Sequence, residues 1–528
     1  MTRAIQQESA LILSAMILGL VNHLYFNRFE PESADGPLLA LTVQPLLLRR
    51  LRIYPQLINR HLSTFPLHPL AHVPGPRLYK VSKLWSVWIC STGAQHTVTK
   101  ALHDKYGPFL RTGPNEVSII HADGVKAVLG TGGFQKGRYY DPQEESKLAC
   151  NHTLQTLRGE EHASRRKIWN RGLSSEAIQE YEYILAKRVS QLADRLQELS
   201  GQPVNLAQWV GYFTFDVMGD MAFGGGFELV RDAGDKEGFW TLIEDGMKTL
   251  SLLSHVPWSA PTLKRLPKGA EPFLKLKGFG EACARNRLER GSSVKDLWYH
   301  LMDEAGIERE KPSLSQVASD GVLTVVAGSD TTSTAISCFM WFVLSNPEIY
   351  HRVQAEVDSV YGEGDSTLDS SKHEELRFLI ACLNETMRLQ PPVPTNGRRR
   401  VPSGGATFIG GCFIPDETEI YVPPYSLHRN PANFSSGPDI YDPDRWFRQH
   451  SPEEVFNTAA FIPFSYGAAN CVGKQFAWRE MLMVTSTLLK RFTFRFPEDF
   501  KSEGWVDGLH DYFVISIGYP LLVEISSR

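Results

Sequence analysis

The sequence has few cysteines, and their spacing does not suit a disulfide framework. Seven are spread over 528 residues, an odd number, and no two form a CxxC pair. This pattern argues against a disulfide-stapled secreted fold and favours a reducing compartment. The sixteen histidines are also scattered, without His and Cys pairs at zinc spacing. Most of the cysteines are therefore predicted to be small buried side chains.

The chain also lacks an excess of positive charge, low-complexity tracts and internal repeats. Its net charge is −4, so no global positive field would attract the phosphates of a nucleic acid. A flavin- or dinucleotide-binding domain is not expected, because GTGGFQKG, which starts at Gly130, lacks the last glycine of GxGxxG. Residues 81–528 are instead predicted to form one large domain that is mainly helical with small β-sheets.

Charged side chains are absent from one stretch near the N-terminus. Residues 9–26 form an uncharged 18-residue run, which is about the length that a bilayer core requires. A second apolar run, residues 37–48, leaves two alternatives open, a second span or a segment in the membrane interface, and the arginines that follow it favour the cytoplasmic side. A cleaved signal peptide is disfavoured, because only Arg3 precedes the first run and no small-residue cleavage site closes it. Residues 1–65 are therefore predicted to be a retained membrane anchor.

Prolines mark the boundary between this anchor and the rest of the chain. Residues 66–80 contain prolines at positions 66, 69, 74 and 76. Proline fixes its own backbone and lacks an N–H donor, so this stretch is predicted to be a hinge without helix or sheet.

The longest predicted helix runs from Ser313 to just before Pro347. Ser313 and Gln316 make a capping box at its start. Because the run is apolar on nearly all sides, the helix is predicted to pass through the core. A further helix is expected over about residues 373–389, and residues 512–527 are predicted to form a hairpin of two strands.

The middle of the long helix contains AGSDTT, residues 327–332, which allows two interpretations. In the first, a kinked core helix has the Thr331 hydroxyl bonded to the carbonyl one turn back. In the second, Ala327 and Gly328 leave space for a flat or gaseous ligand, and Asp330 and Thr331 deliver protons into that space. A buried aspartate is costly without a partner, but this stretch alone does not choose between the two.

Two shorter motifs pair opposite charges. Glu385 and Arg388 in ETMR are three residues apart and so share one helix face, a spacing at which surface ion pairs are common. Arg445 follows in DPDRW, which would allow one carboxylate to lie between two guanidiniums.

Cys471 has the most informative neighbours of the seven cysteines. In FSYGAANCVG, Gly467 permits a tight turn, and Gly473 removes a side chain where something flat must approach. A predicted helix begins directly afterwards, and a helix N-terminus favours a thiolate. This thiolate would be a nucleophile or a metal ligand, and no histidine nearby suits the first role.

Together these patterns resemble the cytochrome P450 family. F-x-x-G-x-x-x-C-x-G beginning at Phe464, E-x-x-R with PDRW, and AGSDTT occur in the family's order and at about its spacing. The resemblance extends from the proline-rich stretch to the C-terminus and implies the family's fold, a single large helical domain with a buried haem. The anchored start is similar to that of microsomal members, and turns such as residues 106–119 are similar to those of filamentous-fungal members.

The resemblance implies a role for each motif. Cys471 would be the axial thiolate ligand of a haem b iron, with Phe464, Gly467 and Gly473 around it. The oxygen groove would be opened by Ala327 and Gly328. The proton relay would consist of Asp330 and Thr331. The structural triad would consist of Glu385, Arg388 and Arg445.

Ala469 departs from the family pattern. The family usually has an arginine there, which donates to a haem propionate, so the positive charge must come from elsewhere. His162 and Arg166, four residues apart on a predicted helix, resemble the family's propionate contacts, and Arg398 fits the third contact.

The implied activity is that of a monooxygenase that oxidises a lipophilic small molecule with O2. Electrons would come from a separate NADPH-dependent cytochrome P450 reductase, and Lys474 and Arg479 beside the thiolate loop would either help dock it or be a solvated face. The expected location is the endoplasmic reticulum membrane with the catalytic domain in the cytosol, and the expected pathway is fungal secondary metabolism. The alternatives are a reductase-independent rearrangement enzyme and a non-catalytic haem-binding protein.

Overall fold

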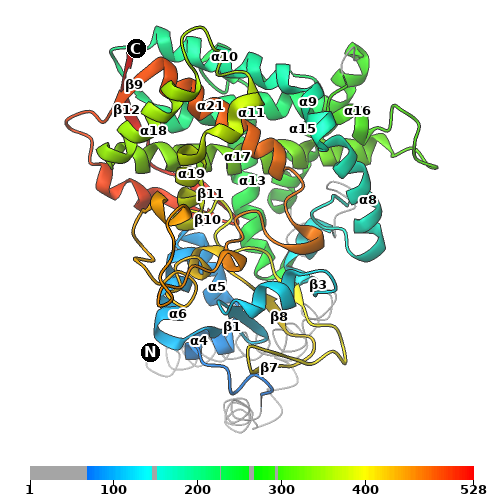
Figure 1. Cartoon of the computed structure of the whole chain (residues 1–528). Coiled ribbons are helices and arrows are strands. Elements are labelled where there is room, and N and C mark those ends of the chain that lie inside the picture. The colour runs from blue at the N-terminus through cyan, green and yellow to red at the C-terminus, as the bar shows by residue number, and fades with distance from the viewer. Residues whose placement is uncertain (1–67, 145–151, 226, 261–266, 292–294) are drawn as a thin grey trace, which may run out of the picture.

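The computed structural model describes residues 68–144, 152–225, 227–260, 267–291 and 295–528. It has a large helical region built around one long central helix, α17, and a smaller strand-containing region near the first described residues (Figure 1). The prediction of a mainly helical protein with small sheets is confirmed.

The α-helices are the most extensive elements of the described residues. The longer ones are α5 (Leu84–Ser91), α6 (Gln95–Tyr106), α8 (Gly159–Gly172), α10 (Glu182–Glu198), α11 (Leu206–Phe223), α13 (Phe239–Ser254), α15 (Pro267–Arg290), α17 (Leu314–Leu344), α18 (Pro347–Val360), α19 (Arg377–Leu389) and α21 (Lys474–Arg491). The short ones are α4 (Arg77–Val81), α7 (Asp141–Glu144), α9 (Ser175–Glu180), α12 (Leu229–Asp232), α16 (Leu297–Leu301) and α20 (Pro424–Leu427).

Four small sheets complete the described fold. The largest has the strand order β1 (Phe109–Gly113), β2 (Glu116–Ile119), β8 (Glu419–Tyr421), β5 (Arg399–Arg400) and β3 (Gln135–Lys136). Its pairs are antiparallel except for β2 with β8. The others are β4 (Pro203–Asn205) with β12 (Leu522–Ser527) and β9 (Phe492–Arg495), β6 (Thr407–Ile409) with β7 (Cys412–Ile414), and β10 (Leu509–Tyr512) with β11 (Val514–Ile517).

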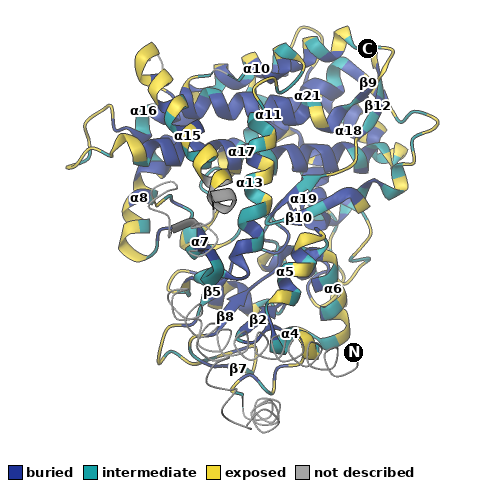
Figure 2. Ribbon diagram, turned by 180° about the vertical axis from the view of Figure 1, so that it is seen from behind, coloured by how far each residue is buried: buried dark blue, intermediate teal, exposed yellow. Residues whose placement is uncertain are grey.

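Helix α17 passes through the core, as its apolar sequence predicted. The Ser313 hydroxyl accepts the Gln316 N–H at 3.2 Å and caps its N-terminus. The helix contacts α11, α15, α19 and α21, and most of its surface is buried (Figure 2). It ends at Leu344, and Pro347 then opens α18. This helix therefore divides the interior and can present different residues to different sides.

Two local predictions are wrong. The last two strands do not form a hairpin with each other, because β11 pairs with β10 while β12 lies between β4 and β9. The strand pattern was correct, but strand partners are set by segments distant in sequence. Residues 66–80 are not free of helix, since α4 begins at Arg77, directly after the last proline of the stretch. Leu70 and Val73 are fully buried, so this stretch also packs against the domain.

The predicted membrane anchor lies outside the described residues, including its span at residues 9–26 and its second apolar run at residues 37–48. Of the helices that the structure does describe, none is both long enough and apolar enough to cross a bilayer.

The carboxylate of Glu385 on α19 lies between two arginines in the core. Its Oε1 accepts from Arg388 Nη2 at 2.8 Å and from Arg445 Nε at 2.9 Å, and its Oε2 accepts from Arg388 Nε at 2.9 Å. All three side chains are at most 1% exposed. The remaining guanidinium N–H groups donate to backbone carbonyls, including those of Pro438 and Ser436. The network therefore ties α19 to the irregular chain that follows α20.

We expect Glu385→Ala to lower the free energy of unfolding by about 3–5 kcal/mol, because it leaves two buried guanidiniums without their anion. Chemical unfolding measures this loss of free energy. If the variant is too unstable to purify, a reduced yield of folded protein is the readout instead. The matched control is Glu374→Ala, which removes an exposed carboxylate just ahead of α19. Equal stability of the two variants would contradict the role of the triad.

A second buried carboxyl group, Glu480 on α21, faces the core without such compensation. Its side chain is about 1% exposed, and neither carboxylate oxygen has a hydrogen-bond partner among the described residues. Burial raises the pKa of Glu480 to about 8, although the neighbouring Thr332 on α17 opposes the rise. Glu480 is therefore protonated at neutral pH.

This protonation predicts how Glu480→Gln changes the pH dependence of stability. The unfolded chain loses the Glu480 proton near pH 4.3, about the value for an exposed glutamate, whereas the native protein keeps it up to about pH 8. The wild type should therefore lose stability relative to the Gln variant as the pH rises through this window, by about 1.4 kcal/mol per pH unit. Free energies of unfolding measured for both proteins across the window test this, and a constant difference would contradict it.

Candidate active site

Cys471 lies in a tight loop immediately before α21. Gly467 has a φ of 73°, and a Cβ atom there would lie 2.0 Å from the Leu129 carbonyl oxygen, so only glycine fits. The Cys471 N–H donates to the Phe464 carbonyl at 2.9 Å and closes the loop. Gly473 is the N-cap residue of α21. The loop geometry therefore holds the thiol at the start of this helix, as the sequence indicated.

The protein alone does not favour the thiolate of Cys471. Burial raises the pKa of this thiol, and the Gly473 N–H and the positive charges of Arg166 and Lys474 only oppose the rise. The N–H at the start of α21 therefore favours the thiolate, as the sequence indicated, but burial outweighs it. A metal ion bound to the sulfur would supply the missing positive charge, because a coordinating thiol is deprotonated.

The Cys471 thiol opens on a cavity of about 300 Å³, which we call the inner cavity. Its walls are largely apolar and include Phe464 from the loop and Met481 from α21. Helix α17 contributes Ala327 and Thr331. The Thr331 hydroxyl donates to the Ala327 carbonyl at 2.7 Å, as the first interpretation of AGSDTT predicted. Thr331 nevertheless lines the cavity, so both interpretations of this stretch describe part of its geometry.

Gly328 does not line the inner cavity, which corrects the prediction that it opens space there. A Cβ atom at Gly328 would lie 2.1 Å from the sulfur of Met218 on α11. The glycine is therefore needed for the close approach of α17 and α11. Ala327 is rotated by about 100° from Gly328 around the helix axis and lines the cavity instead.

The charged side chains that line the inner cavity are all basic. The charged ones are Lys136, Arg166 and Arg399, the neutral imidazole of His162 lies with them, and no Asp or Glu lines the cavity within the described part of the chain. Arg166 also holds the thiolate loop, because it donates to the backbone and side-chain oxygens of Asn470, both at 2.7 Å. Burial and the charges of Lys136 and Arg166 lower the pKa of His162 to about 4, so its ring is neutral at pH 7.

Arg398, which was predicted to contact the haem, does not line this cavity, whereas its neighbour Arg399 does. The Arg398 Nε atom lies 3.4 Å from Glu116, and its guanidinium lies over the rings of Tyr139 and Tyr421. Successive side chains in extended chain point to opposite sides, so Arg399 faces the cavity when Arg398 faces away. The sequence analysis named only Arg398, and the pairing of β5 with β8 is what sets the orientation of Arg399.

Asp330 and Thr331 are adjacent but line different cavities. Asp330 lines a second cavity of about 350 Å³, which we call the outer cavity and which lies between α11, α13, α17 and the β10–β11 hairpin. Burial and the charge of Glu244 raise the pKa of Asp330 to about 7. Met247 and Val514 line both cavities and so lie at their boundary.

Several lining residues were not found from the sequence. Arg399 was missed by one position, because strand alternation places neighbouring side chains on opposite faces without indicating which face meets the cavity. Phe513 and Val514 reach the inner cavity from the C-terminal hairpin, about 40 residues after the cysteine. No local sequence signal marks them, because only the packing of the hairpin against α17 brings them to the cavity.

The residues present fit the haem that the resemblance implies. The group is bound through a thiolate and carries two carboxylates, and the inner cavity presents one thiol and four basic side chains. The Nε atom of Arg399 is buried without a hydrogen-bond partner, which is the state expected of a donor to an anionic group that the protein does not itself supply. Other basic residues can thus supply the positive charge that the family's usual arginine would provide at the position of Ala469.

Comparisons with known proteins agree with this geometry. A family model described as Cytochrome P450 matches residues 74–503. Cytochrome P450 monooxygenase FCK2 of Fusarium pseudograminearum is 32% identical, over 85% of this chain and 81% of that protein. Cytochrome P450 monooxygenase orf5 of Eupenicillium brefeldianum is 31% identical, over 87% and 92%, and Tryprostatin B 6-hydroxylase of Aspergillus fumigatus is 28% identical, over 85% and 79%. The chain therefore belongs to the cytochrome P450 family and is a cytochrome P450 monooxygenase.

Proposed function

We propose that this monooxygenase oxidises a lipophilic small molecule in fungal secondary metabolism, with O2 and with electrons from a separate NADPH-dependent reductase. One observation carries the proposal. The Cys471 thiol opens from its tight loop onto a largely apolar cavity that Ala327 and Thr331 of α17 also line. An apolar cavity of this kind suits a lipophilic substrate.

In this proposal the inner cavity holds haem b, which supplies the oxidising chemistry on dioxygen. Cys471 binds the iron through its sulfur. Arg399 and His162 donate to the carboxylates, and Arg166 supports the loop through Asn470. These residues replace the arginine that the family usually has at the position of Ala469.

Asp330 and Thr331 handle protons on the two sides of α17. With a pKa of about 7, Asp330 is about half protonated at neutral pH and can exchange its proton in the outer cavity. Thr331 presents its hydroxyl to the inner cavity. The presence of both residues favours dioxygen chemistry over the reductase-independent rearrangement.

The pathway assignment rests on the relatives. They come from Fusarium, Eupenicillium and Aspergillus, and one of them is named for the 6-hydroxylation of tryprostatin B. A fungal secondary metabolite is the substrate class that these names support for this chain.

The proposed location is the endoplasmic reticulum membrane, with residues 1–65 as the anchor and the catalytic domain in the cytosol. Leu78, Leu84 and Trp88 are each more than half exposed on α4 and α5, close to the proposed anchor in sequence, and an apolar surface of this kind suits contact with lipid. For the reductase, Lys474 is the better docking candidate, because Arg479 forms an ion pair with Glu182 at 2.6 Å.

The thiolate assignment predicts a spectroscopic difference between two cysteine variants. Reduced wild-type protein with carbon monoxide should show the red-shifted Soret band of a thiolate-ligated haem. Cys471→Ala should lose this band, whereas Cys382→Ala should keep it, because Cys382 is fully buried in α19 and does not line the cavity. Undenatured wild-type holoprotein without the band would contradict the assignment.

The proton relay predicts that Asp330→Asn lowers product formation by about 100-fold while NADPH is still consumed, because a positioned acid contributes about this much. The wild-type rate should fall as the pH rises above about 7, since Asp330 then loses its proton, and the variant should lack this inflection. The substrate for this assay is a molecule whose binding shifts the Soret band. Product formation, NADPH consumption and peroxide release are then measured with it. Ser329→Ala is the control, because Ser329 bonds the Thr214 carbonyl on α11. If Asp330→Asn kept both the wild-type product yield and the fall in rate above about pH 7, the proposed proton relay would be contradicted.

A further inference from the structure

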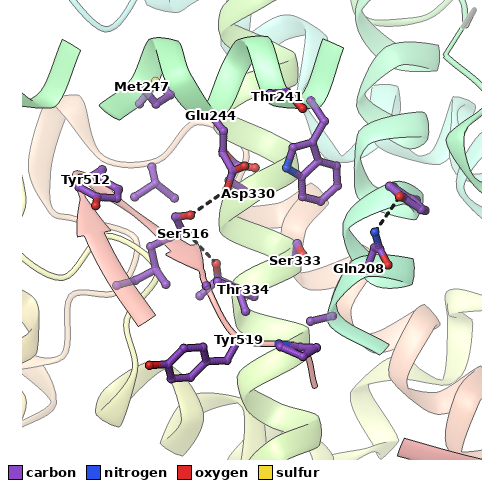
Figure 3. Close-up of a pocket in the computed structure, with 18 of the residues that line it drawn as sticks. Gln208, Thr241, Glu244, Met247, Asp330, Ser333, Thr334, Tyr512, Ser516 and Tyr519 are labelled. Carbon is purple, nitrogen blue, oxygen red and sulfur yellow. Dashed lines mark hydrogen bonds between the residues drawn. The ribbon is translucent and has the colours of Figure 1, made fainter. Parts of the chain in front are cut away.

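The outer cavity has the form of a binding site that the proposed chemistry does not explain. Helix α13 contributes Glu244 and Thr241, which are exposed, and α17 contributes Asp330, Ser333 and Thr334 on the other side (Figure 3). With a volume of about 350 Å³, the cavity can hold a substantial organic group and not only solvent.

The charge of the outer cavity is opposite to that of the inner cavity. Asp235, Glu244 and Asp330 line it, and no Lys, Arg or His does so among the residues that the structure describes. Lys248 is near but does not line the cavity, and its Nζ lies 5.2 Å from the centre of the Tyr512 ring. A cleft with charges of one sign concentrates ions of the other sign, so this cavity should attract cations.

Two of the three carboxylates are available to a ligand. The carboxylate of Asp235 accepts the backbone N–H groups of Phe239 and Trp240 and so caps α13. Glu244 accepts only the Ser516 hydroxyl, at 2.8 Å, and Asp330 has no hydrogen-bond or ion-pair partner among the described residues. Figure 3 shows Glu244 reaching from α13 toward Asp330 on α17.

The repulsion between these two carboxylates contributes to the raised pKa of Asp330. A positive group between Glu244 and Asp330 would remove this repulsion and gain two attractive interactions.

The walls favour an organic cation over a metal ion. Tyr212, Trp240, Tyr512 and Tyr519 line the cavity, and the faces of such rings attract ammonium groups. In contrast, no group of three or more His, Cys, Asp or Glu side chains in the described part of the chain is arranged to hold a metal ion. Aromatic rings beside the carboxylates of Glu244 and Asp330 are suited to a protonated or quaternary amine.

The outer cavity adjoins the inner one at Met247 and Val514, which line both. We propose that the substrate is a lipophilic amine whose positive nitrogen binds between Glu244 and Asp330 while its apolar part extends past Met247 and Val514 toward Cys471. This inference rests on the proposed function of the inner cavity and adds the chemical class of the substrate to it.

Calorimetry on the haem-loaded protein tests the proposal with a matched pair of ligands. The cation is phenylbutyl(trimethyl)ammonium, which keeps its charge at every pH and has no lone pair to bind iron. The neutral partner is phenylpropyl tert-butyl ether, in which a C(CH3)3 group replaces N(CH3)3+ and an oxygen replaces one CH2. The variants are Glu244→Gln and, as a control, Asp245→Asn, an exposed acid on the same helix that does not line the cavity.

We expect the wild type to bind the cation about tenfold more tightly than the ether. Glu244→Gln should remove most of this preference without changing the affinity for the ether, and Asp245→Asn should keep it. Binding of the cation should also shift the Soret band, because its phenyl end reaches the inner cavity. Equal affinities in the wild type, a preference that survives Glu244→Gln, or cation binding without a Soret change would each overturn the inference.

The carbon monoxide spectrum of the same samples separates this inference from the proposed function. If the wild type lacks the thiolate band, the proposed function fails and this inference fails with it. If the band is present and the wild type shows no preference for the cation, only the amine inference fails.

Discussion

The burial of one carboxylate between two arginines is the constraint on which the geometry of the active site depends. Glu385 fixes Arg388, and Arg388 Nη1 donates to the His428 carbonyl at 3.0 Å. His428 Nε2 then accepts the backbone N–H of Ile462 at 2.9 Å, and its ring stays neutral because burial lowers its pKa to about 3. Ile462 lines the inner cavity just before the loop that carries Cys471. Buried hydrogen bonds thus connect a triad remote from the chemistry to the segment that precedes the thiol.

Helix α17 separates two environments of opposite charge. Its Thr331 faces the inner cavity, which is lined by basic groups, and the adjacent Asp330 faces the outer cavity, which is lined by acidic ones. Adjacent residues differ by about 100° around a helix axis, so one short motif can serve both sides. In the proposed function, this arrangement links proton supply to substrate binding, because Asp330 would bind either a proton or an ammonium group that enters the outer cavity.

Much of the fold followed from local sequence signals. The cap at Ser313 and the apolar run after it predicted α17 to within a residue or two at each end, because capping and hydrophobic burial are local in sequence. The partners of the C-terminal strands were not predictable in this way. β12 pairs with β4 and β9, whose sequences lie about 300 and 30 residues away, and a strand pattern specifies which face is buried but not which neighbour covers it.

The active site, like the fold, combines features set by local sequence with features set only by the tertiary structure. The sequence by itself determined the thiol at Cys471, the glycine turn before it, the triad and the family, because each is a fixed spacing of residues whose chemistry is local. Only the tertiary structure decided that Arg399 and not Arg398 faces the cavity, that Gly328 packs against α11, and that Asp330 faces a second, acidic cavity. Which way a side chain faces, and what electric field it meets there, depend on elements that are distant in sequence and come together only on folding.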